Sequence, residues 1–283
     1  TGVLRLIEQY RPVHVSLVGG DPLVRYRELQ VLLPEMARRG IHVQLVTSAF
    51  REIPEEWTTL PRLNICVSVD GLQPEHDVRR KPATYERILR SIAKSRVTIH
   101  CTVTAQMLHR PGYIEEFVRF WSAREQVKRI WISLFTPQQG ATGAEILSRK
   151  QRTQVIEELA LLRESYPRLK MSKELIEELK RPPESPRECI FARTTASVSA
   201  DLKTQITPCQ FGGNPDCSQC GCMASMGLAA VGHHRVLPGI TAGTVFSVSE
   251  WMGKGTNRFR SRFLADNNVK NHHGVTNRLT VID

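Results

Sequence analysis

The sequence contains no long hydrophobic run, and this absence excludes one class of protein at once. No stretch of the 283 residues approaches the roughly 20 consecutive apolar residues that a transmembrane helix needs. The sequence also contains no internal repeat and no low-complexity tract, which excludes a repeat architecture. What remains is a chain of ordinary hydrophobic content, long enough for one large domain or two modest ones.

A massed block of basic residues is also missing, although the formal net charge is +11. Such an excess could suit nucleic acid, a membrane surface or an acidic substrate, but the lysines and arginines are scattered. The segment RFRSRF at 258–263 interleaves arginine with phenylalanine, as some nucleic-acid patches do. A solvated arginine face above packed phenylalanines explains it more simply. We therefore expect neither nucleic acid nor a membrane as a partner.

Strand-like and helix-like patterns alternate between residues 13 and 135. The predicted strands are 13–18, 41–47, 63–69, 97–104 and 129–135, and the predicted helices between them are 25–39, 52–60, 84–95 and 113–126. This alternation predicts an α/β fold whose parallel strands form an open sheet or part of a barrel. Two more helices are predicted at 148–165 and 172–180. The proline-rich stretch RPPESPRE at 181–188 then predicts a linker.

The first of these strands runs into a glycine pair, in the sequence VHVSLVGGDPLVRY at 13–26. Gly19 and Gly20 allow the backbone to turn sharply and to approach a ligand closely. Asp21 can accept hydrogen bonds. A glycine-rich loop between a strand and a helix is a common ligand-binding place in α/β proteins, although a tight turn alone also explains such a pair.

Five of the seven cysteines fall late in the sequence. Cys66 and Cys101 lie in apolar strands and are predicted to be core residues. The late ones are Cys189, Cys209, Cys217, Cys220 and Cys222, of which the last four have the spacing C-x7-C-x2-C-x-C. Disulfides are not expected in a large α/β chain without a secretory signal. Thiols this close together on Gly- and Pro-rich loops can converge on one centre, so the sequence predicts a metal or cluster site.

Several segments, taken in order, resemble the radical S-adenosylmethionine (radical SAM) superfamily. GGDP at 19–22 resembles its GGE-type motif, VTSA at 46–49 resembles its TNG turn, and SVDGLQPEHDVRR at 68–80 resembles a segment of members with a C-terminal cluster domain. The late cysteines resemble the SPASM or twitch auxiliary-cluster extension. The resemblance spans roughly residues 3–225. It implies an α/β fold with an incomplete (β/α)6 parallel barrel, a partial TIM barrel, followed by a small cysteine-rich C-terminal domain.

One element of the family pattern is missing. Radical SAM enzymes hold a catalytic [4Fe–4S] cluster with C-x3-C-x2-C after the first barrel strand, and no such motif precedes Gly19. We expect that the first strand and its cluster loop are absent from this chain, which alone would be inactive and would bind the cofactor poorly. The strand at 13–18 should then present an open edge. The expected domains are a partial barrel at 1–145, a helical connection at 146–183 and an auxiliary-cluster domain with a tail at 184–283.

The resemblance also implies roles for single residues. S-adenosylmethionine would be bound at the strand ends by Gly19, Gly20, Asp21, Thr47, Ser68, Asp70 and Arg79. Asp21 stands where the family usually has Glu and would take the methionyl amino group, Ser68 the ribose, and Arg79 the carboxylate. We expect His76 and Asp77 to brace a loop. No acid–base residue is assigned, because the cofactor carries the chemistry, hydrogen abstraction by a 5′-deoxyadenosyl radical.

The resemblance further implies one auxiliary [4Fe–4S] cluster on this chain. Its expected ligands are Cys209, at least two of Cys217, Cys220 and Cys222, and Cys189 at the head of a strand-like segment. The pairs His233–His234 and His272–His273 are more simply solvated than ligands. A reductant such as flavodoxin or ferredoxin, a peptide or cofactor precursor as substrate, and a cytoplasmic location are expected. Two alternatives stay open: a non-catalytic radical-SAM-like scaffold and a zinc-ribbon binding module.

Overall fold

The computed structural model describes residues 2–233, 235–237, 240–241 and 279–282. The RFRSRF segment, His234 and the pair His272–His273 lie outside these residues. None of the described helices is both long enough and apolar enough to cross a bilayer.

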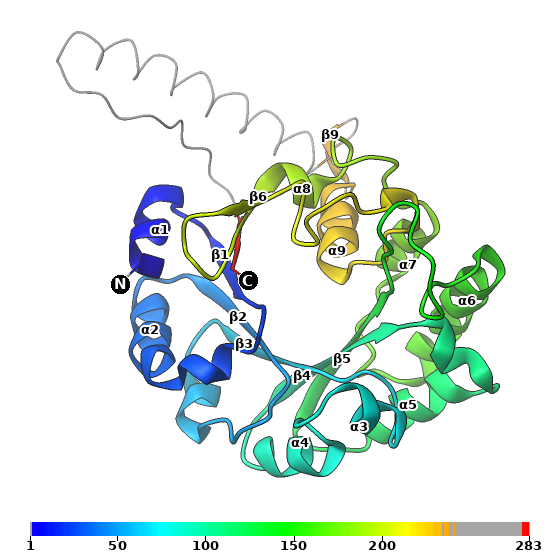
Figure 1. The fold of residues 1–283 in the computed structure, drawn as a ribbon, viewed down its shortest axis with the longest axis horizontal. Coiled ribbons are helices and arrows are strands. Elements are labelled where there is room, and N and C mark those ends of the chain that lie inside the picture. The colour runs from blue at the N-terminus through cyan, green and yellow to red at the C-terminus, as the bar shows by residue number, and fades with distance from the viewer. Residues whose placement is uncertain (1, 234, 238–239, 242–278, 283) are drawn as a thin grey trace, which may run out of the picture.

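A parallel sheet forms the centre of the fold, and its five strands match the predicted ones to within two residues at each end. They are β1 (His14–Leu17), β2 (His42–Thr47), β3 (Leu63–Ser68), β4 (Val97–Val103) and β5 (Val127–Leu134). Neighbours in the sequence are neighbours in the sheet, and every pairing among them is parallel. Figure 1 shows the sheet curving around the middle of the molecule. The architecture is α/β and consistent with a partial radical SAM barrel.

Helices cover the outer face of this sheet. They are α1 (Gly2–Tyr10), α2 (Tyr26–Arg38), α4 (Tyr85–Ser91) and α5 (Tyr113–Ser122), with a short α3 (Glu75–Arg79) and the 3-10 turns η1 (Pro22–Arg25), η2 (Glu55–Thr59) and η3 (Ala105–His109). Alternate strand residues such as Leu45 and Ile99 pack on helix residues such as Leu33 and Phe117 in one apolar core. The helix predicted at 52–60 is only the 3-10 turn η2, because prolines at 54 and 61 bracket it.

The expected open edge beside β1 is wrong. The last described segment, β10 (Leu279–Ile282), pairs in parallel with β1 on one side and with β6 (Thr195–Val198) on the other. The sheet therefore has eight strands in the order β5-β4-β3-β2-β1-β10-β6-β7, where β7 (Gln205–Ile206) is antiparallel to β6. Pairing with β10 satisfies backbone groups of β1 that an edge strand would leave to water.

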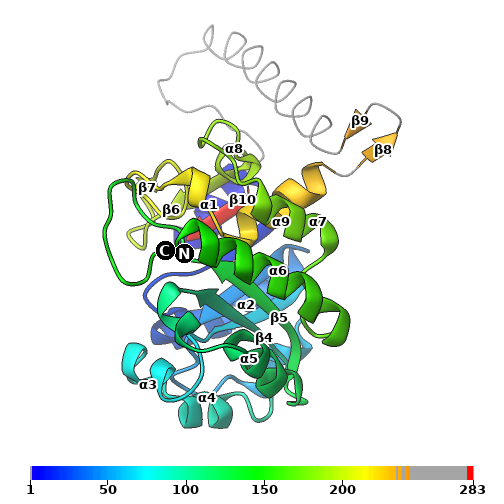
Figure 2. The ribbon, with the colours of Figure 1, turned by 90° about the vertical axis from the view of Figure 1, so that its right-hand side faces the viewer.

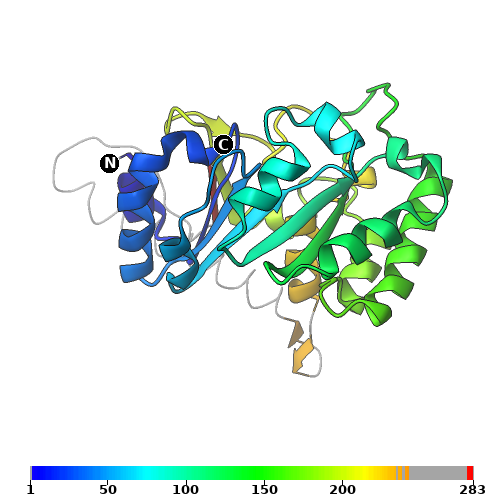
Figure 3. The same cartoon turned by 90° about the horizontal axis from the view of Figure 1, so that it is seen from below.

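The second half of the chain packs beside β5. The helices α6 (Arg149–Ser165) and α7 (Lys173–Lys180) confirm the prediction, and Ser148 and Ser172 cap their first turns. Figure 2 shows them beside α9 (Met223–Gly232), which the sequence analysis missed because its small residues and glycines carry little helical pattern. Figure 3 shows the strands running between the helices of the first half and these later ones. The hairpin of β8 (Arg235–Leu237) and β9 (Ile240–Thr241) follows.

The cysteine segment departs from the prediction at its start. Cys189 does not head a strand: it is the N-cap residue of a short helix, α8 (Ile190–Thr194), and β6 begins only afterwards. Another 3-10 turn, η4 (Cys217–Gln219), begins the later cysteine group. Cys220 and Cys222 belong to the same apolar core as the barrel strands. The cysteine segment is thus built onto the barrel.

Candidate functional site

Asp21 ties the glycine loop to the end of β2. Its carboxylate accepts hydrogen bonds from the backbone N–H of Leu23 at 3.0 Å and from the hydroxyl of Thr47 at 2.7 Å. Ser48 donates both its backbone N–H, at 2.8 Å, and its hydroxyl. Ser48 is not among the predicted site residues, although it lies in the VTSA segment that resembles the family turn. In this structure the carboxylate therefore braces two loops.

Gly19 and Gly20 both have backbone angles that favour glycine, with φ of +85° and +45°. No atom lies within 4 Å of the place where a Cβ on Gly20 would stand. The backbone at this turn is therefore open to a ligand, which is what a cofactor-binding loop needs.

Asp70 and Arg79 lie in a network of charges beyond the end of β3. The Asp70 carboxylate accepts from the Arg80 guanidinium at 2.7 Å and lies 3.7 Å from Nε of Arg79. Arg79 also pairs with Glu145, and donates to Gln106 at 3.2 Å. A substrate or cofactor carboxylate would therefore have to replace an existing partner of Arg79.

His76 and Asp77 brace the loop that carries this network. His76 is fully buried; its Nδ1 accepts from the Asp70 N–H at 2.9 Å and its Nε2 donates to the Ala83 carbonyl at 2.8 Å. Burial lowers the pKa of this imidazole, which suits the neutral form that these two bonds require. Asp77 accepts from the Tyr85 N–H at 2.7 Å. Both residues have the bracing role that the sequence suggests.

The structure brings the predicted cofactor residues to one end of the sheet. The glycine loop follows β1, Thr47 and Ser68 are the last residues of β2 and β3, and Asp70 and Arg79 come soon after. These are the carboxyl ends of parallel strands, where such folds place their ligands. The described contacts join the residues in two groups, Asp21 with Thr47 and Asp70 with Arg79.

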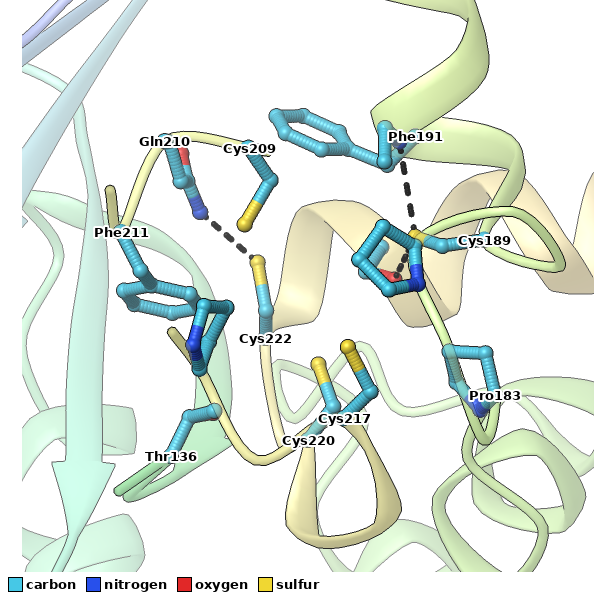
Figure 4. Close-up of a pocket in the computed structure, with 14 residues that line it drawn as sticks. Thr136, Pro183, Cys189, Phe191, Cys209, Gln210, Phe211, Cys217, Cys220 and Cys222 are labelled. Carbon is cyan, nitrogen blue, oxygen red and sulfur yellow. Dashed lines mark hydrogen bonds between the residues drawn. The ribbon is translucent and has the colours of Figure 1, made fainter. Parts of the chain in front are cut away.

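The five late cysteines line one cavity, shown in Figure 4. It holds about 380 Å³ of empty space, part of it open to solvent. The rest of the lining is mostly apolar, with the polar exceptions Thr136, Gln210 and Ser225. All five thiols are free. His233 does not line this cavity and pairs with Glu178 at 2.6 Å.

The Cys220–Cys222 loop is held against the end of β5. The Leu134 N–H donates to the Gly221 carbonyl at 3.0 Å, and the Gly221 N–H donates to the Thr136 hydroxyl at 3.0 Å. A Cβ on Gly221 would lie only 2.4 Å from the Leu134 oxygen, so this close approach requires glycine. The Arg152 guanidinium donates to the Gln219 carbonyl at 3.0 Å and to the Cys220 carbonyl at 2.6 Å.

Hydrogen-bond donors and burial set the chemistry of the thiols. Gln210 Nε2 lies 2.8 Å from the Cys222 sulfur, and Ser225 Oγ lies 3.1 Å from the Cys189 sulfur. Burial raises the pKa of Cys222 to about 12 and that of Cys217 to about 11, with the neighbouring thiols adding to the effect. Thiols in such surroundings stay protonated at neutral pH until a cation compensates the thiolate charge.

The donor set fits an iron–sulfur cluster. It consists of thiols alone, in an apolar cavity on glycine- and proline-rich loops, with the Ala192 N–H directed at the Cys189 sulfur. In the part of the chain that the structure describes, no three His, Cys, Asp or Glu side chains are grouped as a site for one metal ion.

The comparison with protein families gives a match to the first part of the chain. The model of the Radical SAM superfamily matches residues 2–121, from α1 through most of α5. The matched part contains the glycine loop, the ends of β2 and β3 and the His76 loop, and it ends before the cysteine segment. A domain of this superfamily indicates chemistry that uses an iron–sulfur cluster and S-adenosylmethionine. A search of curated proteins found no match.

Proposed function

We propose that this chain belongs to a radical SAM enzyme that also carries an auxiliary [4Fe–4S] cluster in its five-thiol cavity. The observation that carries this proposal is the position of that cavity, which is built onto the end of β5 in a sheet whose first four strands match the superfamily. When bound, the catalytic cluster and S-adenosylmethionine supply a 5′-deoxyadenosyl radical that abstracts hydrogen from a substrate.

The residues of this chain have binding and positioning roles in that scheme. The open backbone of Gly19 and Gly20, the Ser68 hydroxyl and the Arg79 guanidinium bind the cofactor at the strand ends, and the Thr47 hydroxyl holds Asp21. Asp21 and Asp70 hold these loops in place, and Asp21 is too fully engaged by Thr47 and Ser48 to be the main ligand of an amino group.

Four of the five thiols are the proposed cluster ligands. Figure 4 shows Cys209 and Cys222 on the side of the cavity near Gln210, Cys217 and Cys220 on a second side, and Cys189 on a third. Electrostatic effects on the pKa values link Cys189 with Cys209, Cys217 and Cys220, and link Cys222 with Cys209 and Cys220, so all five thiols lie close together. A [4Fe–4S] cluster takes four thiolates. We assign Cys189, Cys209, Cys217 and Cys220, with Cys222 left outside and held by Gln210.

Anaerobic reconstitution with iron and sulfide tests the auxiliary cluster. We expect brown protein with visible absorbance and close to four iron and four sulfide per chain. Cys189→Ala or Cys220→Ala should lower both counts strongly, while Cys66→Ala, which removes a thiol on β3, should not. A colourless chain that retains one zinc would instead support the zinc-ribbon module.

A second measurement separates the enzyme from a non-catalytic scaffold. The protein that contains this chain, reconstituted and reduced, should release 5′-deoxyadenosine from S-adenosylmethionine. If both clusters assemble and a strong reductant still gives no 5′-deoxyadenosine, the protein is the non-catalytic radical-SAM-like scaffold rather than an enzyme.

A further inference from the structure

The inner face of the sheet, opposite the helices, is polar. Register places Gln44 beside Asn64, Cys66 beside Thr98, and Thr98 beside Arg129. The intervening residues, such as Leu45, Ile65, Ile99 and Ile130, belong to the apolar core. The residues named in the register, Gln44, Asn64, Cys66, Thr98 and Arg129, do not belong to it. We use "inner-face cluster" for Asn64, Cys66, Thr98, Lys128 and Arg129.

Two cations of this cluster are half-buried without a compensating charge. The pairing of β4 with β5 shifts after Val97, so that Lys128 has no partner residue and Arg129 stands opposite Thr98. Register places Arg129 beside Thr98, which is itself beside Cys66, and both cations lie close enough to the buried Cys66 thiol to favour its ionised form. Burial lowers the pKa of Lys128, and the charge of Arg129 lowers it further. Among the described residues, no carboxylate forms an ion pair with either cation.

Asn64 adds an unused donor to the same place. Its Oδ1 accepts from the Thr98 hydroxyl at 2.9 Å. Its Nδ2 is buried and has no hydrogen-bond partner in the described structure. A buried donor without a partner is costly and is rare in folded proteins, unless a ligand or water completes it. Arg129 is held in turn by Trp131, whose ring centroid lies 5.6 Å from the guanidinium carbon.

We propose that the inner-face cluster binds an anionic group of the substrate, a carboxylate or a phosphate. Arg129 offers a planar pair of donors that suits either oxyanion, Lys128 adds charge, and Asn64 Nδ2 supplies a neutral donor. The identification of the bound anion as part of the substrate rests on the proposed function. The existence of the anion site does not rest on it.

The position of the cluster fits this role. Asn64 and Thr98 are the second residues of β3 and β4, and Arg129 is the third of β5. They therefore lie toward the amino ends of the strands, whereas Gly19, Thr47 and Ser68 lie at the carboxyl ends. A substrate anchored here by its anionic group would extend along the inner face toward the cofactor end, with a remote carbon nearest the radical.

Calorimetry on the purified chain tests the site with two probes, inorganic phosphate and succinate, each at ionic strength held constant with sodium chloride. We expect one of the two to bind measurably, and the identity of the better probe distinguishes a phosphate site from a carboxylate site. Arg129→Gln should weaken that binding at least tenfold. Arg90→Gln removes an exposed arginine on α4 and should leave it unchanged.

Two further measurements keep the test decisive. If Arg129→Gln does not fold, Arg129→Lys retains the charge but loses the planar fork, and should still weaken binding severalfold. Equal binding by the wild type and a folded Arg129 variant, or no binding of either probe, would overturn the proposal. Iron and sulfide content is measured on the same preparations. A chain that forms its cluster but binds no anion refutes only this inference, and a chain that binds the anion but forms no cluster refutes only the auxiliary-cluster proposal.

Discussion

Gln210 distinguishes Cys222 from the other thiols of the cavity. Its Nε2 lies 2.8 Å from the Cys222 sulfur, and Cys222 is almost completely buried, whereas Cys209 on the same side is partly exposed. A [4Fe–4S] cluster takes four thiolates and the cavity has five thiols, so one is left over; we propose that it is Cys222, the more buried of the two and already bonded to Gln210.

This arrangement predicts the effect of serine substitutions in the reconstituted protein. Cys222→Ser should keep the wild-type iron and sulfide content, because Cys222 is not a ligand, and Cys209→Ser should lose most of it. In the Cys209→Ser background, Gln210→Leu releases Cys222 and should restore part of the cluster, with a changed paramagnetic resonance spectrum. The assignment would be wrong if Cys222→Ser emptied the site while Cys209→Ser left it filled.

His100 gives the fold a dependence on pH. Burial lowers its pKa to about 4, and its Nε2 lies 2.7 Å from the Ser133 hydroxyl. That hydroxyl accepts the Met223 N–H at 3.1 Å, so it can donate its own proton only to an unprotonated Nε2. Between pH 6.5 and about 4 the unfolded chain takes up a proton that the folded chain does not. The contribution of neutral His100 to the free energy of unfolding is therefore complete above pH 6.5 and is lost as the pH falls from 6.5 to about 4.

The predicted loss is about 2 kcal/mol in the free energy of unfolding between pH 7.5 and pH 5.0. Urea titrations at both pH values should show this loss in the wild type and in His109→Gln, which changes an exposed histidine. In His100→Gln the fall should be smaller by that amount. An equal fall in all three proteins would contradict the role given to His100.

At the scale of elements, the junction between β5 and the cysteine loop depends on one glycine. Gly221→Ala would place a methyl group 2.4 Å from the Leu134 oxygen, so the loop would have to move off the strand. We expect lower thermal stability and poorer cluster assembly, measured by calorimetry and by iron content. Gly227→Ala on α9 is the matched control: nothing lies within 4 Å of the added Cβ, and alanine favours a helix by up to about 1 kcal/mol. Equal behaviour of both variants would show that the loop is not fixed there.

The same junction marks the limit of what the sequence could predict. Strands such as 63–69 are visible because β-branched residues recur at every second position between turn signals. The contacts of Gly221 with Leu134 and Thr136 join residues more than 80 positions apart, and no local sequence pattern predicts them. Cys189 was assigned to a strand because the residues after it are β-branched, but its own turn is helical. Gln210 carried no signal other than its place beside Cys209.

On the scale of the whole molecule, β10 connects the two halves of the sheet. It pairs with β1, from the part that matches the superfamily, and with β6, from the cysteine segment. The sequence analysis did not predict this pairing, because a four-residue strand more than 70 positions from β6 leaves no periodic signal. Through β10, backbone hydrogen bonds run continuously from β5 to β7.

Removal of residues 279–283 should therefore lower the local stability of β1 and β6, the two strands that pair with β10. Hydrogen exchange of the β1 amides at 14–17 and of the β6 amides at 195–198 should become at least tenfold faster, because the partner strand of each is gone. Exchange in β4, which is separated from β10 by three strands, should change little and serves as the internal control. The cysteine cavity should survive, because its loop is held by β5 and Arg152 rather than by β10. Unchanged protection of β1 and β6 in the shortened chain would show that β10 does not pair with them in solution.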